Sequence, residues 1–137
     1  MPVGIGKYHY GYMTFENFFG EEIEYVYIFY YQSNFTGTSR RQHFKEKFIS
    51  AIPNQKVLED IFPFRYELNT ESSHCFWQVN LRTISGRNYE TDGSFRCSIK
   101  QGDGGKVIMG VNGDSQSVYM HFSQSSDCSS HLFLLLD

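Results

Sequence analysis

The chain has 137 residues and a formal charge of -3, from 12 Lys and Arg against 15 Asp and Glu. A chain of this length can bury roughly two thirds of its unfolded surface, so residues 1–137 are expected to form a single domain with one core. The charge balance provides no basic field that would collect phosphates, which disfavours nucleic acid as a partner.

Short apolar segments separated by turn-forming residues follow one another along the whole chain. Aromatic residues make up 18% of the sequence, and aromatics favour pleated, half-buried surfaces. The segments between strands are rich in Gly, Asn, Asp and Ser, which tolerate turn geometry. The pattern is typical of an all-β, antiparallel sandwich or barrel. The predicted strands are Tyr8–Glu16, Ile23–Gln32, Phe44–Ala51, Val57–Leu68, Phe76–Ile84, Tyr89–Thr91, Ser94–Ile99, Lys106–Val111, Ser117–Phe122 and Ser130–Leu136.

The second of these strands, which contains "EYVYIFYYQ", does not alternate apolar with polar residues. Both of its faces are apolar, and they carry Tyr25, Tyr27, Phe29 and Tyr31 on one parity and Val26, Ile28 and Tyr30 on the other. A strand of this kind is covered on both sides. The cover of the second side can be the chain's own loop "NFTGTSRRQHF", a second subunit or a ligand.

The later strands alternate clearly enough to assign their faces. The residues assigned to the core are Phe62, Phe64, Tyr66, Leu68, Trp77, Val79, Leu81, Phe95, Cys97, Ile99, Val107, Met109, Val111, Val118, Met120 and Phe122. The residues expected on the opposite, solvated faces are Glu59, Arg65, Glu67, Gln78 and Asn80.

The beginning of the chain and its cysteines bear on location. The first twenty residues lack an apolar segment behind a basic start, and no apolar run is long enough to span a bilayer. Cys75, Cys97 and Cys128 are odd in number and sparse, unlike a disulfide framework. We therefore expect a cytoplasmic protein that folds without a disulfide, in which the sequon at Asn34 occurs by chance.

Catalytic and metal-binding motifs are weak in this sequence. The five histidines are scattered, without HExxH or Cys-x-x-Cys spacing, which disfavours zinc. The cysteines are expected to be buried or idle thiols, because free Cys is among the most buried residue types. "SSDCSSH" brings Ser, Asp and His together in sequence, but a triad requires spatial adjacency. We expect no enzyme and no cofactor.

Two acidic glycine loops, "QGDGGK" and "NGDSQ", lie on either side of the strand at Lys106–Val111. They should emerge at opposite ends of that strand and so cannot form one calcium cage. Asn-Gly and Asp-Gly pairs mark hairpin turns, which is the main interpretation. Because loops often carry binding residues, Asp103 and Asp114 are also candidates for contacting a polar ligand.

The order of several segments resembles the Up-regulated in Daf-two domain family. These segments are "YMTFENFFGEEIEYVYI", "IPNQ", "FPFRYELNT", "CFWQVNLRTISGRNYETDGSFRCSIKQGDGGKVIMGVNG" and "SSDC". The resemblance implies a single-domain antiparallel β-sandwich similar to that of the aegerolysins, commonly dimeric and without an established enzymatic role. Aegerolysins themselves recognise membrane lipids. The family pattern also places the smaller branched residues of the second strand inside, which supports the expectation that Val26, Ile28 and Tyr30 face the core.

Two functions follow as hypotheses. In the first, the chain is a non-catalytic binding or assembly module that forms a homo- or hetero-dimer, and Tyr25, Tyr27, Phe29 and Tyr31 face the partner. In the second, it is an aegerolysin-like module that recognises a lipid or a glycan through aromatic residues near its loops.

Overall fold

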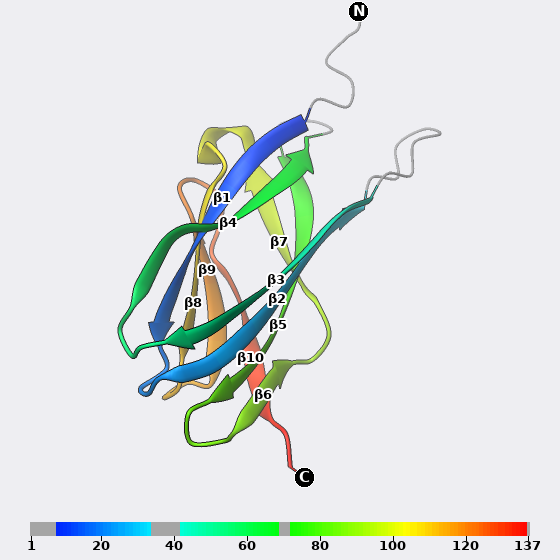
Figure 1. The fold of residues 1–137 in the computed structure, drawn as a ribbon. Coiled ribbons are helices and arrows are strands. Elements are labelled where there is room, and N and C mark those ends of the chain that lie inside the picture. The colour runs from blue at the N-terminus through cyan, green and yellow to red at the C-terminus, as the bar shows by residue number, and fades with distance from the viewer. Residues whose placement is uncertain (1–7, 34–41, 69–71, 137) are drawn as a thin grey trace, which may run out of the picture.

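The computed structural model describes residues 8–33, 42–68 and 72–136 (Figure 1). These residues are almost entirely strand, with one short 3-10 turn at Gln101–Asp103, and they confirm the all-β fold. The strands are β1 (Tyr8–Phe18), β2 (Ile23–Ser33), β3 (Gln42–Ile52), β4 (Val57–Glu67), β5 (Ser72–Thr83), β6 (Asn88–Thr91), β7 (Phe95–Lys100), β8 (Lys106–Asn112), β9 (Ser117–Phe122) and β10 (Cys128–Leu134). Each predicted strand corresponds to one of these; β9 has the predicted bounds, and the others are shifted at one or both ends.

The strands form one continuous, strongly curved sheet in the order β3-β2-β5-β6-β10-β9-β8-β1-β4, and β7 pairs with β5 beside β6. Among the described pairings all are antiparallel except that of β1 with β8, which is parallel. A parallel pair requires a long connection, and here most of the chain separates the two strands. Figure 1 shows the sheet closing on itself into a near-barrel.

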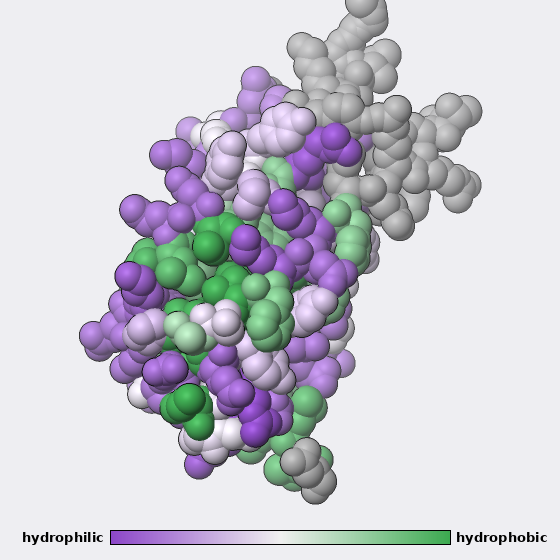
Figure 2. Space-filling model, in the orientation of Figure 1, coloured by the Kyte–Doolittle hydropathy of each residue, from purple (hydrophilic) through white to green (hydrophobic). Residues whose placement is uncertain are grey.

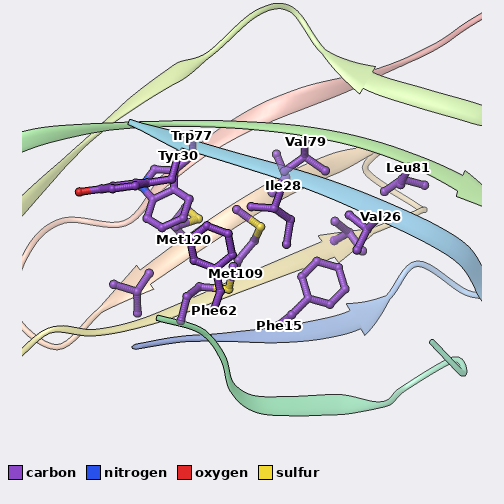
Figure 3. Close-up of a cluster of buried hydrophobic side chains, with 14 of the residues drawn as sticks. Phe15, Val26, Ile28, Tyr30, Phe62, Trp77, Val79, Leu81, Met109 and Met120 are labelled. Atoms are coloured by element: carbon purple, nitrogen blue, oxygen red, sulfur yellow. The ribbon is translucent and has the colours of Figure 1, made fainter. Parts of the chain in front are cut away.

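The core is built from the inward side chains of both halves of this sheet. Trp77 on β5 is 1% exposed and its ring lies 4.7 Å from that of Tyr30, 5.2 Å from that of Phe64 and 5.7 Å from that of Phe62. Met109 and Met120 from the opposite side are fully buried, and Figure 3 shows these side chains pointing toward one another. The alternation in the sequence therefore identified most of the core correctly.

Strand β2 has the parity expected from the sequence. Val26 and Ile28 are fully buried and Tyr30 is 1% exposed, so this side of the strand faces the core. Tyr30 donates a hydrogen bond from its hydroxyl to the carbonyl of Arg65 at 2.8 Å, and burial raises the pKa of Tyr30 far above its ordinary value. The tyrosines of the other parity therefore lie on the outer surface of the sheet.

Strands β3 and β4 follow one another through a turn, yet they are the two ends of the hydrogen-bonded path in the described part of the chain. Pro63 on β4 has no N–H to donate to a neighbouring strand. Lys45 and Lys47 on β3 lie opposite Tyr30 and Ile28 of β2, which places both lysines on the inward face of an edge strand. Proline and inward lysines both oppose edge pairing, so the seam between β3 and β4 stays open.

A side chain bridges the far end of this seam. Gln32 of β2 accepts a hydrogen bond from the backbone N–H of Glu67 at 2.6 Å and donates one to the Glu67 carbonyl at 2.9 Å. Glu67 is 3% exposed, so the prediction that it lies on a solvated face is wrong. Tyr66 is also 3% exposed, so successive residues at the end of β4 are buried on both sides of the strand.

Candidate functional site

The most prominent surface feature is a row of aromatic rings on the outside of strands β2, β3 and β5. It consists of the four predicted residues Tyr25, Tyr27, Phe29 and Tyr31, together with Phe48 of β3 and Phe76 of β5, and we call it the aromatic face. The strand register brings them together, because Tyr27 lies opposite Phe48, and Tyr31 opposite Phe76. Residues directly opposite one another share a face of the sheet.

The rings of the aromatic face stack on one another. The centroids of Tyr27 and Phe29 are 4.7 Å apart with 13° between the ring planes, and those of Tyr31 and Phe76 are 4.8 Å apart at 11°. Tyr25 and Phe48 are also stacked, at 5.2 Å. This mutual packing leaves the β2 aromatics half-buried, while Phe48 is 55% exposed. Much of the ring surface is thus buried by stacking within the chain, and the ring edges and the remaining ring faces are exposed to solvent.

Sequence reasoning missed Phe48 and Phe76, although a signal for Phe76 was present. Assigning Trp77, Val79 and Leu81 to the core places Phe76 on the opposite face of β5. Phe48 could not be assigned in this way, because the lysines of β3 obscure its alternation. The pairing of β2 with both β3 and β5 was needed to join these rings to the tyrosines.

Polar groups lie among the rings. The Tyr27 hydroxyl donates a hydrogen bond to the Glu46 carboxylate of β3, and this bond, with burial and the negative charge of Glu46, raises the pKa of Tyr27. Asn80 lies directly opposite Tyr27 on β5, and its side-chain oxygen is buried without a hydrogen-bond donor. An unpaired buried acceptor costs free energy, and because this oxygen is enclosed within the chain it is not presented to another molecule.

The structure places Asp103 in the interior. This residue is 2% exposed and follows β7 in the short 3-10 turn. Its carboxylate accepts hydrogen bonds from the backbone N–H groups of Lys100 at 2.7 Å, Gln124 at 2.6 Å and Ser125 at 2.8 Å, and from the Ser125 hydroxyl at 2.5 Å. Burial raises the pKa of Asp103, but these four bonds outweigh it and hold the pKa below its ordinary value. Asp103 therefore fastens the β7–β8 turn to the segment after β9.

Asp114 lies at the other end of β8, exposed in the turn between β8 and β9. In that turn the Asn112 side chain, rather than Asp114, accepts the backbone N–H of Ser115 at 3.1 Å. The two acidic loops thus emerge at opposite ends of β8, as expected. Neither they nor any other described residues form a group of three or more His, Cys, Asp or Glu placed to hold a metal ion.

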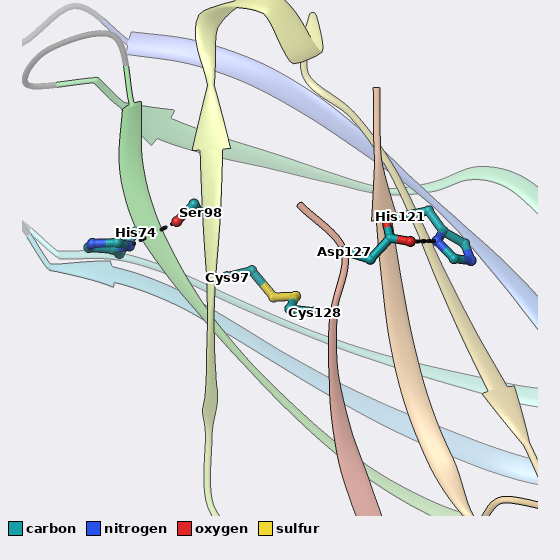
Figure 4. The surroundings of a disulfide bond; sticks show 6 residues. All are labelled: His74, Cys97, Ser98, His121, Asp127 and Cys128. Carbon is teal, nitrogen blue, oxygen red and sulfur yellow. Dashed lines mark hydrogen bonds and ion pairs between the residues drawn. A yellow bond between two sulfur atoms is a disulfide. The ribbon is translucent and has the colours of Figure 1, made fainter. Parts of the chain in front are cut away.

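The prediction that the chain folds without a disulfide is wrong. Cys97 of β7 and Cys128 of β10 are bonded, with their Cα atoms 5.8 Å apart (Figure 4). The bond joins two strands that are not hydrogen-bonded neighbours, and the two cysteines are 31 residues apart in sequence. Cys75 is the free cysteine, and burial raises the pKa of its thiol to about 12 despite a hydrogen bond with Tyr30.

His74 and His121 lie in two separate polar pairs, as Figure 4 shows. His121 Nδ1 lies 2.8 Å from an oxygen of Asp127, and His74 Nδ1 lies 3.3 Å from the hydroxyl of Ser98. A catalytic triad needs one histidine bonded to both the acid and the nucleophile. In the described part of the chain these two contacts belong to different histidines, so the Ser, Asp and His residues are not assembled into such a site.

No protein-family model and no curated protein matches this chain. The resemblance to the Up-regulated in Daf-two domain family consequently remains a prediction. Among the described residues, no helix is long and apolar enough to cross a membrane.

Proposed function

We propose that this protein is a non-catalytic binding module of the Up-regulated in Daf-two domain type, and that it dimerises through its aromatic face. The observation that carries the proposal is the concentration of six aromatic side chains on one outer sheet surface. Monomeric proteins rarely expose large contiguous apolar patches, and aromatic residues are enriched at the centres of protein interfaces. The partner is a second copy or a related chain.

The stacking of the rings supports a protein partner rather than a glycan. Sugars bind aromatic platforms through free, flat ring faces, whereas these rings already stack on one another at 4.7 and 4.8 Å. Tyrosine hydroxyls tolerate water when the partner is absent, which suits a surface that is exposed for part of the time.

The test is the double variant Tyr27→Arg and Phe29→Glu, measured by sedimentation velocity and circular dichroism. It should remain folded and become monomeric, because unpaired charges at an interface centre are costly to bury. The matched control is Tyr12→Arg with Phe133→Glu, which changes two aromatics of 49% and 48% exposure on other strands. The control should leave the dimer intact. A Tyr27/Phe29 variant that stays dimeric places the interface elsewhere, and one that unfolds assigns the face to the monomer's own core.

The alternative of self-covering by the loop "NFTGTSRRQHF" concerns residues 34–41, which lie outside the described residues. The unfolding outcome of the double variant is the one that this alternative predicts. Asn34 and its sequon lie in the same segment.

A second function, lipid recognition of the aegerolysin type, is supported by a different observation. At the end of β10 the residues Phe133, Leu134, Leu135 and Leu136 are 41% to 87% exposed. Apolar and aromatic side chains at one end of the fold suit insertion into a membrane interface. Co-sedimentation with liposomes tests this function: binding should be lost on Leu134→Ser with Leu136→Ser, and a wild-type protein that stays in the supernatant argues against it.

The disulfide between Cys97 and Cys128 argues against the cytoplasmic location that the sequence predicts. Disulfides persist in oxidising compartments and are rare in the cytosol. Thiol labelling of freshly lysed cells decides between the two: a labelled Cys97 indicates a reducing compartment, and a protected one an oxidising compartment.

A further inference from the structure

The open seam between β3 and β4 contains a cleft of about 450 Å³. Figure 2 shows hydrophobic side chains gathered between these two strands, with hydrophilic ones around them. The volume lies within the range of sites for small organic ligands, about 300 to 1,000 Å³. Four aromatic residues line the cleft, namely Tyr10, Tyr30, Phe44 and Phe64.

The cleft exists because the two edge strands cannot pair there. Pro63 has no N–H to offer, and Lys45 projects inward from β3 where a neighbouring strand would approach. The floor is rigid: the rings of Tyr30 and Phe64 lie 5.0 Å apart, and the Tyr30 hydroxyl is fixed to the Arg65 carbonyl at 2.8 Å. The seam is thus a preformed opening onto the aromatic core rather than a loosely packed strand pair.

The charged side chains that line the cleft are both basic. Lys45 and Arg65 line it, and no carboxylate does so among the described residues. Lys45 is half-buried and forms no ion pair in the described part of the chain; its ammonium lies 5.9 Å from the centre of the Phe62 ring. A cation–π contact at this distance is weak compared with a charge-assisted hydrogen bond to an anion. The ammonium is therefore placed to receive an anionic group.

We infer that this cleft binds a small aromatic carboxylate, with its ring among Tyr10, Phe44 and Phe64 and its carboxylate on Lys45. Ring stacking and apolar burial would hold the body of such a ligand, and the Lys45 ammonium would select its charge. None of the six residues of the aromatic face lines the site, and the two adjoin at Phe44, which lies opposite Tyr31 on the outer side of β3.

Trp77 provides a built-in reporter for the test. It is the only tryptophan of the chain, its ring packs 4.7 Å from Tyr30 and 5.2 Å from Phe64, and its indole N–H has no hydrogen-bond acceptor. Its indole resonance in a ¹H–¹⁵N correlation spectrum should therefore move when the cleft is occupied. The probes are 2-naphthoate and its neutral counterpart 2-naphthamide, titrated into the full-length protein.

We expect 2-naphthoate to shift the Trp77 signal saturably and to bind at least about tenfold more tightly than 2-naphthamide. Lys45→Met should weaken 2-naphthoate binding by about tenfold and leave 2-naphthamide unchanged. Lys47→Met is the matched control, because Lys47 lies two residues along the same inward face but does not line the cleft, and it should have no effect. Equal affinity for the two probes, no effect of Lys45→Met, or no saturable Trp77 shift would each overturn the inference.

Discussion

Asp103 provides the sharpest test of how the loops around β8 are held. Asp103→Asn keeps the size of the side chain but replaces one carboxylate oxygen by an NH2 group. One carboxylate oxygen accepts hydrogen bonds from the Lys100 N–H and the Ser125 hydroxyl. The other oxygen accepts hydrogen bonds from the N–H groups of Gln124 and Ser125. Whichever oxygen is replaced, two charge-assisted bonds are lost. At about 1.5 kcal/mol for each bond, the variant should lose about 3 kcal/mol of unfolding free energy.

The pH dependence follows from the depressed pKa of Asp103. Its contribution to stability is complete above the unfolded pKa and is lost as the pH falls through the lower, folded pKa. The deficit of Asp103→Asn should therefore be full at pH 7 and shrink below about pH 4. Urea unfolding at pH 7 and pH 3 measures it. Asp114→Asn, an exposed change in the other acidic loop, is the control and should stay within about 0.5 kcal/mol of wild type. A deficit that is absent at pH 7, or equal at both pH values, would refute this account.

Two further predictions concern the core and the disulfide. Trp77→Ala should cost about 3 to 5 kcal/mol in thermal or urea unfolding, because the ring is 1% exposed, and an unchanged melt would remove Trp77 from the core. Cys97→Ser with Cys128→Ser should cost about 3 to 4 kcal/mol, the chain-entropy value for a separation of 31 residues. When the wild-type protein is denatured without a reducing agent, a thiol reagent should label Cys75 alone. Labelling of all three cysteines would contradict the disulfide between Cys97 and Cys128.

The sequence predicted well those features that depend on local alternation. Val26, Ile28 and Tyr30 face the core because the period of two is a property of a single strand. Glu67 was wrongly assigned by the same rule, since its burial depends on a contact with Gln32 from a distant strand. Alternation predicts which side of a strand faces inward, and it does not show where the end of that strand meets another part of the sheet.

Features that depend on sheet order could not be predicted from the sequence. The bond between Cys97 and Cys128 requires β7 and β10 to come together, and an odd number of sparse cysteines carried no sign of it. The role of Asp103 likewise depends on Ser125, 22 residues away, which packs against the turn only in the folded sheet. The glycines around Asp103 correctly indicated a turn, but an aspartate in a turn looks the same in sequence whether it faces solvent or the interior.

The most direct test of dimerisation through the aromatic face is hydroxyl-radical footprinting over a range of protein concentrations. If the face is a subunit interface, oxidation of Tyr27 and Phe29 should fall as the concentration rises, while oxidation of Tyr10 and Tyr12, which are 66% and 49% exposed on β1, should stay constant. Reactivity of Tyr27 and Phe29 that does not change across the whole range would contradict the proposed interface.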